Sequence, residues 1–150
     1  MSFHTHPERA DTVTQRNHAS MNFEHVAINV PEPIAMAAWY EKHLGLEIVR
    51  AMNEAPHTHF LRDSGGAMML EIYRNPPDNV PDYASMDPLL LHLAFVSEDP
   101  AGDKTRLVNA GATLVEELHL DDGSHIVMLR DPWGVSFQLC KRGVPMLARQ

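Results

Sequence analysis

Short apolar runs, separated by turn residues, follow one another along most of the chain. The run FEHVAINV (23–30) has apolar residues at every second position, which predicts a strand with one apolar face. The segment IAMAAWYEKHL (34–44) follows a proline-containing turn and stops before Gly45, which predicts a helix of about three turns. Three more strands are predicted by short runs bounded by Gly, Pro, Asp and Asn: LEIVR (46–50), HTHFLRD (57–63) and AMMLEIY (67–73).

The second half of the chain repeats this order of elements. Its predicted strands and helix are LLHLAFV (90–96), AGDKTRLVNA (101–110), ATLVEE (112–117), SHIVMLRD (124–131) and VSFQLC (135–140). His25 and His92 are separated by 92 − 25 = 67 residues, and Glu71 and Gln138 by 138 − 71 = 67. A constant offset of this kind indicates an internal duplication.

Each half therefore reads strand, helix, strand, strand, strand. We expect an α+β domain of two paired βαββ modules, with the helices against one face of the sheet. A stretch with four prolines separates the halves and is the natural connector. The expected boundaries are a mobile tail at 1–21, a single domain at 22–142 (module one at 22–74, connector at 75–88, module two at 89–142) and a C-terminal tail at 143–150.

Four polar side chains interrupt the predicted apolar strands: His25, Glu71, His92 and Gln138. Because side chains alternate along a strand, all four lie on the face opposite the residues that pack under the helices. A carboxylate among apolar neighbours is costly in free energy unless it is paired or bound to a cation. The pattern therefore predicts a site with a compensating partner on this common face.

The composition narrows the class of partner. The net charge is −8 and the basic residues form no cluster, which argues against nucleic acid or an anionic membrane surface as a partner. The chain has no apolar run of the roughly 18 residues that span a membrane and shows no secretory signal. Its single cysteine, Cys140, cannot form an internal disulfide and fits a reducing compartment. We expect a cytoplasmic protein that acts on small molecules.

The duplicated modules, the histidine in the first strand of each, the acid or amide in the last strand, and the segments WYEKHLGLE (39–47) and RDPWG (130–134) together resemble the vicinal oxygen chelate superfamily. This group includes glyoxalase I, methylmalonyl-CoA epimerase, extradiol dioxygenases, and fosfomycin and bleomycin resistance proteins. The resemblance covers about residues 22–142. It implies a curved mixed sheet with a concave metal or ligand site, and a homodimer in which modules pair between chains.

In members that bind metal, the ligands come from the first and last strand of each module. Carried over by position, the resemblance implies His25, Glu71, His92 and Gln138 as metal ligands. Bacterial glyoxalase I would show His, Glu, His, Glu, and the epimerase His, Gln, His, Glu. The dioxygenases place their carboxylate where Gln138 stands. The sequence therefore matches no subfamily pattern in full.

Two imidazoles and one carboxylate can bind zinc, nickel, cobalt, manganese or iron(II), and the amide of Gln138 can add a weak fourth contact. An amide cannot accept a substrate proton, so Glu71 is the better candidate for a catalytic base. His59 and His125, which precede the apolar cores of their strands, are candidates for residues of the pocket.

Three functions remain open from the sequence. The first is a metal-dependent isomerase or lyase of the glyoxalase-like type, which transfers a proton beside a metal-chelated carbonyl of a small oxygen-bearing substrate. The second is an iron(II) ring-cleaving dioxygenase-like enzyme, in which His25, His92 and Glu71 form a facial triad. The third is a metal-free small-molecule binding or resistance protein.

Overall fold

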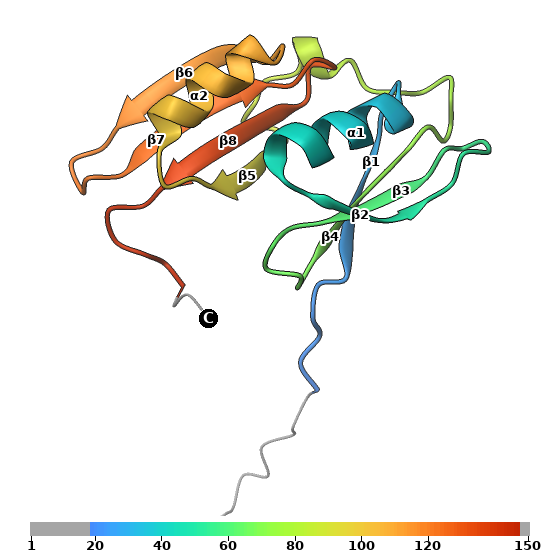
Figure 1. The fold of residues 1–150 in the computed structure, drawn as a ribbon, viewed down its shortest axis with the longest axis horizontal. Helices are drawn as coiled ribbons and strands as arrows, with labels where there is room; N and C mark the ends of the chain where they lie inside the picture. The colour runs from blue at the N-terminus through green and yellow to red at the C-terminus, as the bar shows by residue number, and fades with distance from the viewer. Residues whose placement is uncertain (1–18, 148–150) are drawn as a thin grey trace, which may run out of the picture.

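The computed structural model of the protein describes residues 19–147, and it contains two four-stranded sheets with one helix over each (Figure 1). Most of the tail predicted at 1–21, and the last three residues of the tail at 143–150, lie outside the described residues. The first sheet and its helix are formed by β1 (His25–Asn29), α1 (Pro33–Leu44), β2 (Glu47–Ala51), β3 (His59–Arg62) and β4 (Met69–Tyr73). The connector contains a short 3-10 helix, η1 (Tyr83–Ser85). The second sheet and its helix are formed by β5 (Leu93–Val96), α2 (Pro100–Asn109), β6 (Thr113–His119), β7 (His125–Arg130) and β8 (Ser136–Lys141).

The two sheets have the same topology. Their strand orders are β1-β4-β3-β2 and β5-β8-β7-β6. The pairs β1/β4 and β5/β8 are parallel and the other pairs are antiparallel, so both sheets are mixed and the predicted α+β class is confirmed. Each module has the order βαβββ, so the shorter formula βαββ omitted one strand. β1 and β5 are the edge strands of two separate sheets.

The strand registers confirm that the two modules are equivalent. In the first sheet Ala27 lies opposite Glu71, and in the second Ala94 lies opposite Gln138. Both pairs keep the offset seen in the sequence, since 94 − 27 = 67 and 138 − 71 = 67. Each module also has an irregularity at the same point of its second strand, between Ile48 and Arg50 in β2 and between Leu114 and Glu116 in β6.

The ends of α1 follow from local chemistry. Pro33 occupies the first turn, where its missing N–H costs no hydrogen bond. Gly45 ends the helix in the left-handed region with φ 71°, and its N–H donates to the Tyr40 carbonyl. Neither helix in the described part of the chain has the length and apolar character needed to cross a membrane.

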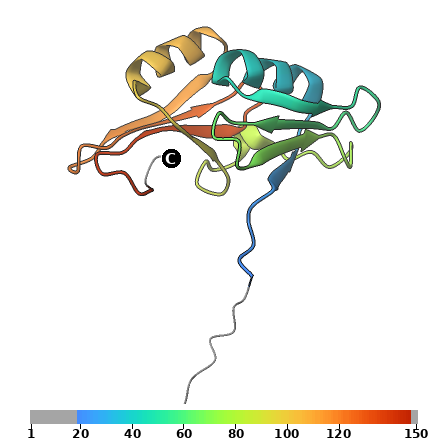
Figure 2. The same ribbon diagram turned by 60° about the horizontal axis from the view of Figure 1, so that its bottom comes forward.

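Each helix covers one face of its sheet, and both helices lie on the same side of the molecule (Figure 2). Under α1, Met36 and Tyr40 are buried against Leu61 and Ile72. Under α2, the buried side chains are those of Leu107, Val127, Leu129, Phe137 and Leu139, together with Ala112. We call the opposite, helix-free side of each sheet its open face; alternation places His25, Phe60 and Glu71 on the first open face and Ala94 and Gln138 on the second.

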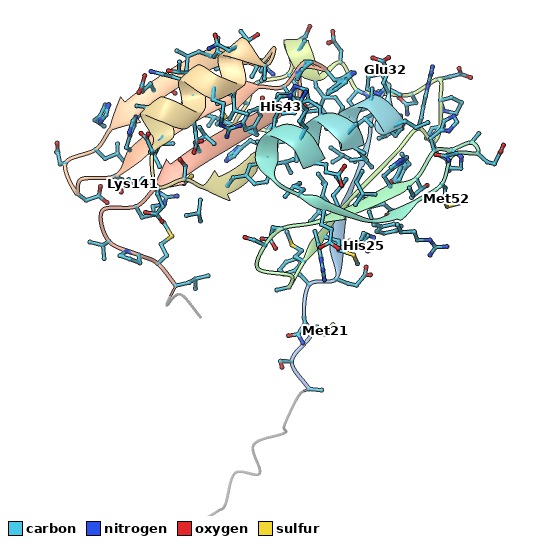
Figure 3. All side chains as sticks on the ribbon, viewed as in Figure 1. Met21, His25, Glu32, His43, Met52 and Lys141 are labelled. Carbon is cyan, nitrogen blue, oxygen red and sulfur yellow. The ribbon has the colours of Figure 1, made fainter. Side chains whose placement is uncertain are left out.

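Helix α1 also binds module two. The hydroxyl of Tyr40 donates to Asp131 Oδ2 at 2.7 Å, and both side chains are buried. The indole N–H of Trp39 donates to the Ala110 carbonyl at 2.9 Å. At the end of α1 that adjoins module two (Figure 3), the His43 carbonyl accepts from the guanidinium of Arg106 at 2.7 Å. These contacts hold the two sheets in one arrangement.

Among the carboxyl groups of the described residues, that of Asp131 has a pKa far from its ordinary value. Burial raises its pKa to about 6, although the Tyr40 hydroxyl and backbone N–H groups, including those of Val135 and Trp133, donate hydrogen bonds that oppose the shift. The raised pKa means that the folded state holds the proton to a higher pH than the unfolded chain does. Ionisation of this group therefore favours unfolding over the interval between the two pKa values.

We expect Asp131→Asn to remove one pH-dependent part of the stability. Between about pH 4 and pH 6 the carboxyl group is ionised in the unfolded chain but still protonated in the folded state. The free energy of unfolding of the parent therefore falls by about 3 kcal/mol over this interval, which corresponds to the rise of the pKa from 3.8 to about 6. Denaturant unfolding at pH 3.5 and pH 7 checks this: the free energy of unfolding of the variant minus that of the parent should rise toward pH 7. Asp63→Asn, at the duplicated and exposed position, is the control; an equal rise there would contradict the assignment.

Candidate functional site

The open face of the first sheet brings two of the predicted ligands into contact. His25 Nε2 lies 3.2 Å from Glu71 Oε2, and the Glu71 side chain is only 18% exposed. His25 is at the start of β1 (Figure 3), and the ring of Phe60 packs edge-on against the imidazole with centroids 5.8 Å apart. Phe60 lies opposite Glu71 in the neighbouring strand, so the carboxylate has an aromatic wall on one side and an imidazole on the other.

Glu24, which was not predicted as a site residue, contacts the other ring nitrogen of His25. Its carboxylate is hydrogen-bonded to Nδ1. This hydrogen bond raises the pKa of His25; the charges of Glu24 and Glu71 add to the rise, and partial desolvation opposes it. Histidines that bind metals usually donate their second N–H to a carboxylate or a carbonyl. The sequence does show an acidic residue next to His25, but strict strand alternation would place Glu24 on the opposite face of the sheet. Alternation does not apply to Glu24, because β1 begins only at His25.

The second half of the predicted site lies beside β5 and β8. His92 directly precedes β5, and its Nδ1 is 2.9 Å from the Pro88 carbonyl. A carbonyl oxygen only accepts, so Nδ1 carries the proton and Nε2 is the nitrogen left to bind a ligand. Gln138 is half-buried on the open face of the second sheet, where its Oε1 accepts from the Cys140 thiol at 3.1 Å.

The structure brings His25 and Glu71 together, but it does not gather all the predicted ligands within one chain. Across residues 19–147, the metal-binding atoms of three His, Cys, Asp or Glu side chains lie within 4.8 Å of one another in one group, and His25, Glu71 and His92 are not that group. The two halves lie on separate sheets whose edge strands β1 and β5 do not pair. The four-ligand site therefore stays a prediction.

A cavity of about 280 Å³ lies between the start of β5 and the first sheet. Its wall contains His92 and is otherwise mostly apolar, with Val26, Leu70 and Phe95 among the lining residues. It can accept a small, largely apolar molecule beside one of the predicted ligands.

His59 and His125, the predicted pocket residues, both lie on helix-covered faces. His59 is buried, shares its face with Leu61, and donates from Nδ1 to the His57 carbonyl at 2.8 Å. His125 shares its face with Val127 and contacts Glu117. Residues two apart in a strand share a face, so both rings point away from the open faces that carry Glu71 and Gln138.

Within the described part of the chain, Glu117, His119 and His125 form a group of three close metal-binding side chains that was not predicted from the sequence. Glu117 and His119 are two residues apart on β6, and His125 lies opposite His119 on β7. Lys104 of α2 lowers the pKa of Glu117 through a hydrogen bond, and His125 adds to this effect. The signal was present in ELHLDDGSH, where a turn folds the last histidine back beside the first.

Several solved structures share the fold. A lactoylglutathione lyase from Agrobacterium tumefaciens is 20% identical, with a TM-score of 0.61, and the match covers 87% of this chain and 100% of that chain. TnmS3, an antibiotic binding protein from Streptomyces sp. CB03234, is 16% identical with a TM-score of 0.65, covering 83% and 98%. A glyoxalase family protein from Enterococcus faecalis is 27% identical with a TM-score of 0.62, covering 79% and 96%.

No curated protein matches the sequence. A family profile, however, matches residues 22–139, which includes every helix and nearly every strand residue of both modules. The duplicated register and the placement of His25 and Glu71 on one open face agree with this match. The chain therefore belongs to the Glyoxalase/Bleomycin resistance protein/Dioxygenase superfamily, the vicinal oxygen chelate superfamily that its sequence resembles.

Proposed function

We propose that the protein is a metal-dependent isomerase or lyase of the glyoxalase-like type, which transfers a proton beside a chelated carbonyl of a small oxygen-bearing substrate. The observation that carries the proposal is the contact of His25 Nε2 with Glu71 Oε2 at 3.2 Å on an open face. This distance is close to the roughly 3.3 Å that separates two ligands of a tetrahedral zinc ion. A shared divalent ion would also compensate the half-buried carboxylate.

The other predicted ligands fit the same donor set. His25 and His92 each have Nδ1 hydrogen-bonded to an oxygen, of Glu24 and of Pro88 respectively, so each can present Nε2. Gln138 supplies an amide oxygen in the register position that matches Glu71. Two imidazoles, one carboxylate and one amide can hold zinc, nickel, cobalt, manganese or iron(II).

We propose that a second copy of the chain completes the site. The His25/Glu71 half and the His92/Gln138 half lie on different sheets, and each sheet ends in an unpaired edge strand, β1 or β5. Apolar side chains are exposed at these edges, among them Val26 and, at 77%, Val96. An exposed apolar edge is a surface that proteins normally cover. A homodimer that places the second open face of one copy against the first open face of the other would cover these edges.

Within this site the residues have distinct tasks. A divalent ion, when bound, would polarise the carbonyl next to the carbon that loses its proton. Glu71 accepts that proton and returns it, because it is the carboxylate among the four side chains and Gln138 cannot accept one. The Gln138 amide adds a weak contact to the ion through its oxygen and can donate from its NH2 group to a substrate oxygen. Glu24 fixes the ring orientation of His25 through Nδ1.

We expect Glu71→Gln to lower the rate of solvent deuterium exchange into substrate by roughly 10²- to 10⁴-fold, because it removes the proton acceptor. Exchange would be measured by mass spectrometry over 2-oxoaldehyde adducts and acyl-CoA thioesters, with protein loaded with each candidate metal. Glu41→Gln, on the exposed surface of α1, is the control and should retain the parent rate. Equal rates for the parent and Glu71→Gln would contradict the assignment of the base.

We expect Glu24→Gln to lower the pKa of His25, because the Glu24 hydrogen bond is the largest cause of its rise. Glu71→Gln should lower the same pKa by less, since it removes a smaller electrostatic contribution. A proton NMR titration of the ring signals in metal-free protein measures both changes. An unchanged His25 pKa in Glu24→Gln would show that Glu24 does not hold the ring in solution.

A second function, a metal-free small-molecule binding protein, is favoured by the apolar cavity of about 280 Å³ beside His92. The fold similarity to an antibiotic binding protein supports it as well. In this alternative, the cavity binds an apolar molecule, and His92 and Asp63 supply the polar contacts of its wall.

Thermal unfolding with and without EDTA separates the two functions. For the enzyme, we expect EDTA to lower the melting temperature of metal-loaded parent more than that of His25→Ala/His92→Ala, because bound metal stabilises only the folded state. The binding protein would show the same EDTA response in both proteins and would retain binding of an apolar fluorescent probe in the double variant.

A further inference from the structure

A cluster of three metal-binding side chains lies near the turn that joins β6 and β7. Glu117 Oε1 is 2.8 Å from His125 Nε2 and 3.9 Å from His119 Nε2. The two imidazole rings are stacked, with centroids 4.0 Å apart, because His119 and His125 are direct partners across the strands. Strand pairing therefore holds one carboxylate oxygen and two ring nitrogens close together.

The distances within this cluster suit a transition metal. Two ligands of a tetrahedral zinc ion are about 3.3 Å apart, and the two Glu117–histidine distances of 2.8 and 3.9 Å lie on either side of that value. His119 is 72% exposed, so its ring can rotate to close the longer distance. His125 is only 14% exposed, so little rotamer freedom is left for binding to remove.

Lys104 of α2 orients the carboxylate of Glu117 through a hydrogen bond. Its ammonium donates to Glu117 Oε2 at 2.5 Å, which leaves Oε1 directed at the two imidazoles. A side chain that orients a ligand in this way is a regular feature of protein metal sites. An ion held by Glu117 would therefore connect β6 and β7 directly and α2 through Lys104.

This cluster is separate from the site of the proposed function. His125 shares the helix-covered face of the second sheet with Val127, whereas Gln138 lies on the open face. An ion at the cluster thus depends on neither His25 nor His92.

We propose that Glu117, His119 and His125 form a second metal site, which binds zinc or a chemically similar divalent ion and ties the β6–β7 hairpin to α2. Imidazole nitrogens with one carboxylate favour zinc, nickel, cobalt or copper(II) over magnesium and calcium, which prefer oxygen ligands. On binding, the proton shared by His125 Nε2 and Glu117 leaves to solvent or moves to Nδ1. The three side chains leave a fourth position for water.

Zinc binding to the full chain, stripped of metal and measured by equilibrium dialysis, tests the proposal. We expect His119→Ala to bind about one equivalent of zinc less than the parent, because two side chains alone hold the ion weakly. The exposed position of His119 and the intact Lys104–Glu117 ion pair keep this variant folded. Far-UV circular dichroism without metal verifies the fold.

Two neighbouring Glu→Gln variants give the control. Glu117→Gln should also bind about one equivalent of zinc less than the parent, whereas Glu116→Gln, which changes the neighbouring exposed carboxylate, should bind as much zinc as the parent. Equal zinc binding by both variants, or by His119→Ala and the parent, would overturn the proposal.

The double variant His25→Ala/His92→Ala distinguishes this site from the proposed catalytic one. We expect it to retain the zinc equivalent that His119→Ala loses, and we expect zinc to raise its melting temperature. Conversely, His119→Ala should keep the EDTA response that depends on His25 and His92. A double variant that binds no zinc would refute the second site and leave the catalytic proposal standing.

Discussion

The arrangement of the molecule depends on one buried hydrogen bond, from the Tyr40 hydroxyl to the Asp131 carboxylate. A carboxylate in an apolar core needs donors, and Asp131 obtains one from α1 and two from its own turn, the N–H groups of Trp133 and Val135. The donor from α1 is the one that crosses between modules. Since α1 is packed on the first sheet and bound to the second, the position of each open face follows from this contact and from the neighbouring Trp39–Ala110 bond.

The topology of the two sheets is the reason why the catalytic proposal involves two chains. α1 covers the first sheet and its Trp39 contacts both apolar clusters, while the open faces lie on the side away from the helices. Within a chain that is braced in this way, the His25/Glu71 half and the His92/Gln138 half remain on separate sheets. A half-site that is already held in place lowers the entropy cost of dimerisation, because few side chains need to be ordered when the second chain binds.

Much of this could be predicted from the sequence because the relevant signals are local or repeated. The two-residue period of strands predicts that His25 and Glu71 lie on one face of the sheet, where they are in contact. The offset of 67 between Glu71 and Gln138 predicts that the two residues occupy equivalent positions in the two modules. What the sequence did not reveal depends on contacts over long distances or on irregular backbone. Tyr40 reads as an ordinary helix residue, and nothing near it indicates a partner 91 residues away. Glu24 lies just outside the strand that alternation assumes, and the Glu117 cluster requires the exact hairpin register.

The Arg-Asp turns at Asp63 and Asp131 show how a duplication can diverge. Both begin with the same tripeptide, Leu-Arg-Asp. Asp63 is exposed and closes its turn by accepting from the N–H of Gly66, while Asp131 is buried beneath a helix of the other module. The same residue type therefore has two different structural roles within one chain. A substitution at Asp63 changes an exposed turn alone, whereas a substitution at Asp131 leaves the buried Tyr40 hydroxyl of the other module without its acceptor, so neither turn can take the place of the other.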